Sequence, residues 1–190
     1  MSDSKPRRTK SRPLAPISVA DPRAGCVAQV RAIRAALGRV LASGRYILGP
    51  EVEAFEREWA AYLRVGYAVG VANGTDALEL ALRAAGVGEG DYVVTAANTV
   101  TATVTAIERA GARVALADVE PDRFTLAADS VARLLDAHRG LRGRVRAIVP
   151  VHLYGMPADL PGLEFLAREI GAVVVEDCAQ AHGARLHGRE

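Results

Sequence analysis

The sequence predicts an α/β fold in which helices cover both faces of a mostly parallel sheet. From Gly66 onward, short apolar runs alternate with segments of helical periodicity. The runs are continuously apolar rather than alternately apolar and polar, which is typical of parallel strands buried on both faces. With 190 residues, 50% of them hydrophobic, the chain is long enough for one compact domain or for a large part of one.

Two helices are expected before Gly66. Apolar residues recur at helical spacing from Val27 to Leu41, and this helix should end near Gly44. The second helix should begin at Pro50, because proline suits the first helical turn. Its expected inner stripe consists of Val52, Phe55, Trp59 and Tyr62. We interpret Trp59 as a core residue rather than as a surface for a ligand ring.

Strands and helices alternate through the rest of the chain. The expected strands are residues 67–72, 92–96, 113–117, 145–151 and 172–175. The expected helices are residues 75–85, 100–110, 131–137 and 160–170.

Composition and targeting signals narrow the class of protein. No apolar run approaches the ~20 residues that span a bilayer, and the N-terminus lacks the pattern of a signal peptide. The two cysteines, Cys26 and Cys178, are too few for a disulfide framework and lack the spacing of a zinc site. We therefore expect a cytoplasmic protein with no membrane partner and no bound metal.

Residues 1–24 are expected to form a flexible, basic lead-in to the fold. The segment is polar and contains four prolines. Five basic residues and one acidic residue lie in positions 1–16, whereas the whole chain has a net charge of only +2. The folded part is therefore slightly acidic. A solvated tail is the simpler interpretation of this basic segment, so we expect no nucleic-acid partner.

Candidate site residues directly follow predicted strands, because ligands of an open parallel sheet gather at the carboxyl ends of its strands. The first candidate is Asn73-Gly74-Thr75-Asp76, where a helix begins. Free backbone N–H groups and the helix dipole favour a phosphate there, although an ordinary helix cap would use the same residues. The sequence lacks a Walker A motif and a G-x-G-x-x-G motif, so it does not support a P-loop or a Rossmann site.

The second candidate is the carboxylate of Asp177, at the end of an apolar strand. A buried carboxylate is costly unless a cation meets it, and a protonated ring nitrogen of a cofactor would be such a cation. Gln180 is three residues further on and could bond a neighbouring ring substituent. The alternatives are that Asp177 caps a turn or pairs with an arginine.

Other strand ends carry weaker signals. The segment 97–103 could present a side chain over a bound ring, or its threonines could only cap and pack. His152 and Tyr154 follow another strand and could reach the same end of the sheet, although a lone histidine is more often structural. Cys178 is interpreted as a small buried residue, since no base for a nucleophile is evident beside it.

A phosphate seat, a ring-facing residue and a buried acid, in this order, are what pyridoxal 5′-phosphate (PLP) requires. The same segments resemble the DegT/DnrJ/EryC1/StrS aminotransferases. The resemblance extends from about Ile17 to the last residue and rests on five ordered blocks. They are SGRYILGP at 43–50, NGTDAL at 73–78, ANT at 97–99, VHLYG at 151–155 and EDCAQAHG at 176–183.

The resemblance implies a fold-type I, PLP-dependent transaminase that acts on nucleotide-linked keto-sugars. Such enzymes usually take the amino group from L-glutamate and work as homodimers with active sites at the subunit interface. By position, Gly74, Thr75 and Asp76 would hold the cofactor phosphate. Asp177 would pair with the pyridinium nitrogen, and Gln180 would contact the ring hydroxyl.

One position departs from the family pattern. The residue after Asn98-Thr99 is commonly aromatic in the family and stacks on the cofactor, whereas this sequence has Val100. Val100 can still pack on a ring, but the stacking contribution is lost. The resemblance further implies that residues 25–190 form part of the PLP-binding large domain, with its C-terminal part and the small domain absent.

The Schiff-base lysine of the family lies downstream of the last block, and this chain ends at Glu190. Its two lysines, Lys5 and Lys10, precede the first helix, and arginine cannot replace a lysine because it stays protonated. We expect the chain to be an N-terminal portion of an aminotransferase that is inactive alone. The alternatives are a shortened, non-catalytic homologue with a cofactor-binding or regulatory role, and a sugar dehydratase with histidine in place of the lysine.

Overall fold

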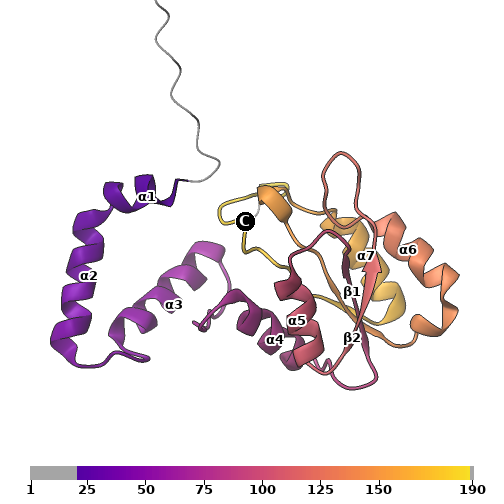
Figure 1. Ribbon diagram of the computed structural model, residues 1–190, viewed down its shortest axis with the longest axis horizontal. Helices are drawn as coiled ribbons and strands as arrows, with labels where there is room; N and C mark the ends of the chain where they lie inside the picture. The colour runs from indigo at the N-terminus through magenta and orange to yellow at the C-terminus, as the bar shows by residue number, and fades with distance from the viewer. Residues whose placement is uncertain (1–20, 189–190) are drawn as a thin grey trace, which may run out of the picture. The chain divides into compact units, whose positions relative to one another are not determined.

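The computed structural model describes residues 21–188, which belong to two compact units that divide between Tyr62 and Leu63 (Figure 1). Among the described residues, no helix is both long and apolar enough to cross a bilayer. The predicted lead-in lies mostly outside the described residues. Its end is helical, because α1 (Pro22–Ala28) begins before Gly25, with Asp21 accepting a hydrogen bond from the backbone N–H of Ala24.

The first unit is helical, as the sequence predicts. Helix α2 (Val30–Ser43) ends at Gly44, whose φ of 66° is the left-handed conformation that glycine adopts at little cost. Helix α3 (Pro50–Leu63) begins at the expected proline. Both helix boundaries therefore follow from local sequence signals.

Among the described residues, the apolar faces of these helices are mostly exposed or half-buried. Helix α2 has no buried residue, and Leu41 is 69% exposed. On α3 the predicted inner stripe is half-buried or exposed: Phe55 is 55% exposed, and the Trp59 ring stacks between the rings of Phe55 and Tyr62. Trp59 is half-buried and stacks on aromatic side chains of its own helix, so its assignment to a core stays a prediction.

The second unit is built on a parallel sheet. Its strands are β1 (Tyr92–Ala96), β2 (Arg113–Ala117), β3 (Val145–Val149) and β4 (Val173–Val174), in the order β2-β1-β3-β4. All three strand pairs are parallel. Its helices are α4 (Gly74–Ala84), α5 (Thr101–Arg109), α6 (Ala128–Ala137) and α7 (Leu160–Ile170), with short 3₁₀ turns at Arg139–Leu141 and Leu153–Gly155. The predicted α/β class is confirmed.

Helices cover both faces of this sheet (Figure 1). Alternate strand residues contribute to two separate cores. One core joins α4 and α5 to the face that carries Val93 and Val149. The other joins α6 and α7 to the face that carries Val94 and Ile148. These four residues of β1 and β3 are fully buried, which explains why both of these strands carry apolar residues on both faces.

The predicted strand at residues 67–72 is wrong. The segment has no strand or helix structure, and Tyr67 and Val69 are 92% and 77% exposed. A strand needs the backbone of a neighbour to bond, and none of the four described strands pairs with this segment. An apolar run alone does not supply that partner.

Candidate functional site

The first turn of α4 offers two unused backbone donors. The Asn73 side chain caps the helix, with its Oδ1 accepting a hydrogen bond of 2.9 Å from the N–H of Asp76. This bond leaves the N–H groups of Gly74 and Thr75 without a partner among the described residues. A Cβ added at Gly74 would meet nothing within 4 Å, so the space beside these donors is open. The turn can therefore bind an anion through two N–H groups and the Thr75 hydroxyl.

Asp177 is a buried carboxylate at the end of the sheet. It is 8% exposed and follows β4, where its backbone forms a parallel bridge to Val151. Its Oδ1 accepts a bond of 3.1 Å from the N–H of Ala179, and its Oδ2 accepts a long bond of 3.4 Å from the Thr103 hydroxyl. Among the described residues no cation pairs with it. A buried carboxylate with only neutral donors can accept a cationic group of a ligand.

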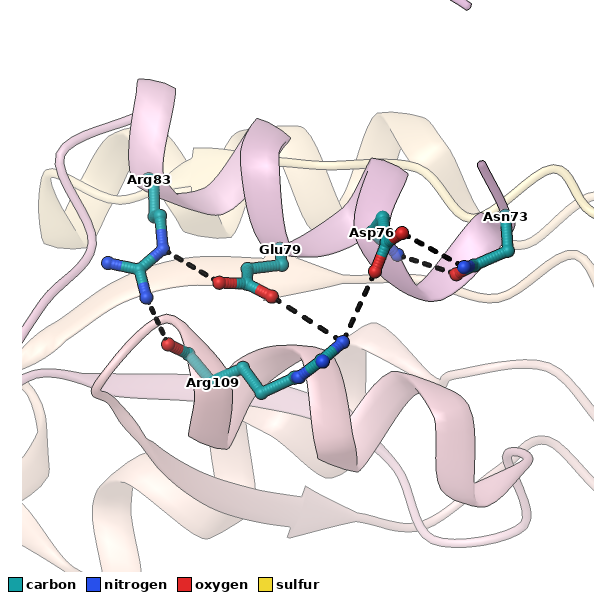
Figure 2. Close-up of polar contacts among 5 residues, drawn as sticks. All are labelled: Asn73, Asp76, Glu79, Arg83 and Arg109. Carbon is teal, nitrogen blue, oxygen red and sulfur yellow. Dashed lines mark hydrogen bonds and ion pairs between the residues drawn. The ribbon is translucent and has the colours of Figure 1, made fainter. Parts of the chain in front are cut away.

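Helix α5 joins these two places. Thr103, in its first turn, donates to Asp177, while Arg109, in its last turn, extends beneath α4 and contacts Asp76 at 3.2 Å (Figure 2). Helical side chains lean toward the N-terminus of their own helix. Arg83, near the end of α4, also donates to the backbone carbonyl of Arg109, so the C-terminal turns of α4 and α5 lie together and the two helices run in the same direction (Figure 2). Both N-termini therefore lie at the end of the sheet where Thr103 bonds Asp177. The anion-binding turn and the acid thus share one end and one face.

Val100 begins α5 at this end of the sheet. It is the N-cap residue of the helix and is 50% exposed. The preceding loop is tied down, since Asn98 Nδ2 donates to the carbonyl of Phe124 at 3.0 Å and the hydroxyls of Thr99 and Thr103 lie 2.9 Å apart. The structure therefore places an exposed aliphatic side chain close to Thr103, at a position where the family commonly has an aromatic residue.

The side-chain carbonyl oxygen of Gln180 accepts a hydrogen bond from the backbone. The backbone N–H of Tyr154 donates to Gln180 Oε1 at 2.8 Å, which leaves the NH₂ group to donate elsewhere. Tyr154 has a φ of 57°, an uncommon conformation for a residue with a side chain. Strain of this kind persists where surrounding bonds hold it, and it is frequent at binding sites. Tyr154 itself is 78% exposed.

His152 is a buried structural residue beside the site, 4% exposed. Its Nε2 lies 3.0 Å from Glu176 Oε2, and its Nδ1 accepts a bond of 3.0 Å from the N–H of Ala158. The Cys178 sulfur and the Glu176 carboxylate raise the pKa of His152 to about 9, and burial offsets only part of this increase. The Ala158 bond opposes protonation, because it needs the lone pair of Nδ1.

The same bond argues against a metal ion here. The ligand atoms of His152, Glu176 and Cys178 lie within 4.8 Å of one another, which is the size of a metal cluster. A metal on Nε2 would move the ring proton to Nδ1, where it would face the Ala158 N–H donor. The cluster is therefore better explained by hydrogen bonds of His152 than by metal binding.

A hollow of the second unit lies at the other end of the sheet, beside the start of β1. This cavity of about 490 Å³ is lined by Tyr92, Leu141 and Arg144 among others. Arg144 already stacks on the Tyr92 ring at 5.0 Å and donates twice to the carbonyl of Gly90. The cavity therefore lies away from the strand ends that carry the candidate site.

Two residues of the site were missed by sequence reasoning. Thr103 was weighed only as part of a capping segment, yet it is fully buried and bonds the acid. Arg109 received no role, yet it pairs with Asp76. Helical spacing places Thr103 one turn after Thr99, but nothing in the sequence indicates that it faces Asp177.

The fold and the site together define a class: an α/β domain of the fold-type I, PLP-dependent aminotransferases. The DegT/DnrJ/EryC1/StrS aminotransferase family matches residues 28–190. The chain belongs to that family.

Curated and solved relatives support the same assignment. The chain is 48% identical over 155 residues to dTDP-3-amino-3,4,6-trideoxy-alpha-D-glucose transaminase from Streptomyces venezuelae, which covers 82% of this chain and 39% of that protein. The crystal structure of S. venezuelae DesV superposes with a TM-score of 0.83 at 45% identity, covering 90% of this chain and 44% of the other. The structure of ntda from Bacillus subtilis, with bound cofactor PMP, gives a TM-score of 0.75 at 31% identity and covers 82% and 34%. The chain thus spans about two fifths of the length of these relatives.

Proposed function

We propose that this chain is the cofactor-binding part of an aminotransferase that acts on nucleotide-linked keto-sugars with PLP and an amino-acid donor, L-glutamate. The observation that carries the proposal is the buried carboxylate of Asp177, which has no cationic partner in the described chain and shares one end of the sheet with the open first turn of α4. The chemistry of these groups fits the two ends of PLP, a phosphate and a pyridinium nitrogen.

Each residue of the site has a role in this proposal. Gly74 and Thr75 bind the phosphate through their N–H groups, and Asp177 keeps a proton on the ring nitrogen. Gln180 donates its free NH₂ group to the ring hydroxyl, and Val100 packs on one ring face. When bound, PLP supplies an electron sink for the carbon that loses its proton.

Three further parts of the proposal concern the protein as a whole. Residues 25–190 are proposed to belong to the large domain of a homodimer. The Schiff-base lysine is proposed to follow Glu190, because the chain contains no lysine after Lys10 and arginine cannot take its place. The nucleotide-linked sugar is inferred from the relatives, since a relative at 48% identity is a dTDP-sugar transaminase. The donor, L-glutamate, is inferred from the family resemblance alone.

The first test is the reading frame that continues past Glu190. A lysine in a Ser/Thr-rich segment is expected there. A histidine at that position would indicate the dehydratase branch, and an uninterrupted frame with neither residue would contradict the proposed transamination. Equilibrium dialysis of the encoded protein should show retention of PMP; retention of ATP or NAD instead would indicate a nucleotide-binding domain and overturn the PLP assignment.

The second test is Asp177→Asn in that complete protein. Turnover of L-glutamate with a nucleotide-linked keto-sugar should fall by about 100-fold or more, the usual loss when a group that stabilises developing charge is removed. The dissociation constant of PMP should change much less, because the phosphate contacts remain. Asp136→Asn, an exposed aspartate of α6, is the matched control and should leave both values unchanged. Near-normal turnover of Asp177→Asn would contradict the role of the acid.

A further inference from the structure

An ion-pair network of four side chains joins α4 to α5. Its members are Asp76, Glu79 and Arg83 of α4 and Arg109 of α5 (Figure 2). Arg109 Nη1 lies 3.2 Å from Asp76 Oδ1 and 3.7 Å from Glu79 Oε2, and Arg83 Nε lies 3.0 Å from Glu79 Oε1. Arg83 also donates to the backbone carbonyl of Arg109.

Asp76 presents an electrostatic problem for the proposed phosphate seat. Its carboxylate lies in the first turn of α4, where Asn73 Nδ2 donates to Oδ2 at 2.9 Å. A negative charge there stabilises the helix, but it also repels any anion that binds the N–H groups of Gly74 and Thr75. The backbone N–H of Asp76 is already used by Asn73, so Asp76 offers a phosphate no donor in compensation.

The network offsets this charge. Two carboxylates and two guanidinium groups sum to zero, and among the described residues Arg109 provides the ion pair to Asp76. Among the described residues, the ion-pair partner of Arg83 is Glu79. Arg83 lies near the C-terminus of α4, seven residues from Asp76 and therefore roughly 10 Å further along the helix axis. Loss of Arg109 would leave a net negative charge beside the anion-binding turn, whereas loss of Arg83 would leave it further away.

We propose that Arg109 is a positioning residue for cofactor binding: by pairing with Asp76, it neutralises the first turn of α4 and so permits a phosphate dianion to bind there. The inference rests on the proposed function and adds a residue that contacts neither the cofactor nor the substrate. The rival explanation is that Arg109 only ties α5 to α4, in which case its charge would have no effect on anion affinity beyond its effect on folding.

The experiment measures the dissociation constants of PMP and of inorganic phosphate for the complete protein and four variants. Arg109→Gln removes the charge, and Arg109→Lys keeps it without the planar guanidinium. Arg83→Gln removes an equal charge from the far end of the same network. The double variant Arg109→Gln/Asp76→Asn removes both partners. Hydrogen exchange of the α4 amides reports whether each variant keeps the helix folded.

Arg109→Gln should weaken PMP binding about fivefold in low salt, because an uncompensated charge roughly 8 Å from a dianion costs that much in water. The loss should shrink in 0.5 M salt, where charges beyond a few ångströms are screened. Arg109→Lys and the double variant should bind PMP about as well as the unchanged protein, and Arg83→Gln should show a smaller loss than Arg109→Gln.

The outcomes separate this inference from the proposed function. If the unchanged protein retains no PMP, the proposed function fails and so does the inference that rests on it. If it retains PMP but Arg109→Gln binds equally well, only the inference is overturned. A loss that is equal for Arg83→Gln, is independent of salt or is not restored by Asp76→Asn would indicate the structural tie instead, and would likewise overturn it.

Discussion

The two units of this chain use the same helical pattern to different effect. In the first unit, α2 carries an apolar stripe and yet has no buried residue. In the second unit, α4 carries a comparable stripe, and its Leu82 is 0% exposed in a core shared with α5 and the sheet. An amphipathic sequence therefore indicates which face of a helix is apolar. Whether that face is buried depends on whether another surface packs against it.

The largest difference between the two units is expected in the free energy of unfolding when one leucine in each unit is replaced by alanine. Leu82→Ala should lower the free energy of unfolding of the second unit by about 3 kcal/mol, because it opens a cavity in a packed core. Leu41→Ala, at a side chain that is 69% exposed, should change the stability by less than about 0.5 kcal/mol. Hydrogen exchange of the β1 and α2 amides measures each unit separately. A large loss for Leu41→Ala would mean that another surface covers α2 in solution.

A smaller difference in helix stability is expected when the residues that precede α4 and α2 are substituted. Asn73 caps α4 through a hydrogen bond of 2.9 Å, so Asn73→Ala should destabilise that helix by about 1 kcal/mol. Gln29 precedes α2 and makes no side-chain capping bond, so Gln29→Ala should have little effect. Circular dichroism during urea unfolding, supported by exchange of the first-turn amides, measures both. Equal effects of the two substitutions would remove the contrast between the units at their helix starts.

The smallest effect is expected from the exposed ion pair of the first unit. Arg39 Nε lies 2.5 Å from Glu51 Oε1 and joins α2 to α3. The hydrogen bond from Arg39 lowers the pKa of Glu51 below its ordinary value of 4.5. The stabilisation is therefore present above pH 4.5 and is lost as the pH falls through the lowered pKa.

Acid titration of helicity tests this expectation. Unfolding of α2 and α3 should become slightly easier below pH 4.5, and Glu51→Gln should remove that pH dependence. The effect should be small, because exposed pairs are weak and screened by salt. A pH dependence that persists in Glu51→Gln would assign it to another acid.

Much of the fold could be predicted because its signals are local. Pro50 and Gly44 fixed two helix boundaries through backbone preferences that need no distant contact. The strands at 92–96 and 113–117 were predicted at their observed bounds because both are short apolar runs between helices. The segment 67–72 shows the same kind of run, yet it forms no strand in the described chain, because pairing with a neighbour is not a local property.

For the candidate site, the sequence alone predicted the acid and the glycine-threonine turn, and it indicated the family. The tertiary structure decided how these groups meet. The bond from Thr103 to Asp177 spans residues on α5 and after β4, and the pair of Arg109 with Asp76 depends on two helices running in the same direction. The physical reason is that periodicity and capping act over one or two helical turns, whereas contacts between distant segments arise only when side chains pack on a common sheet.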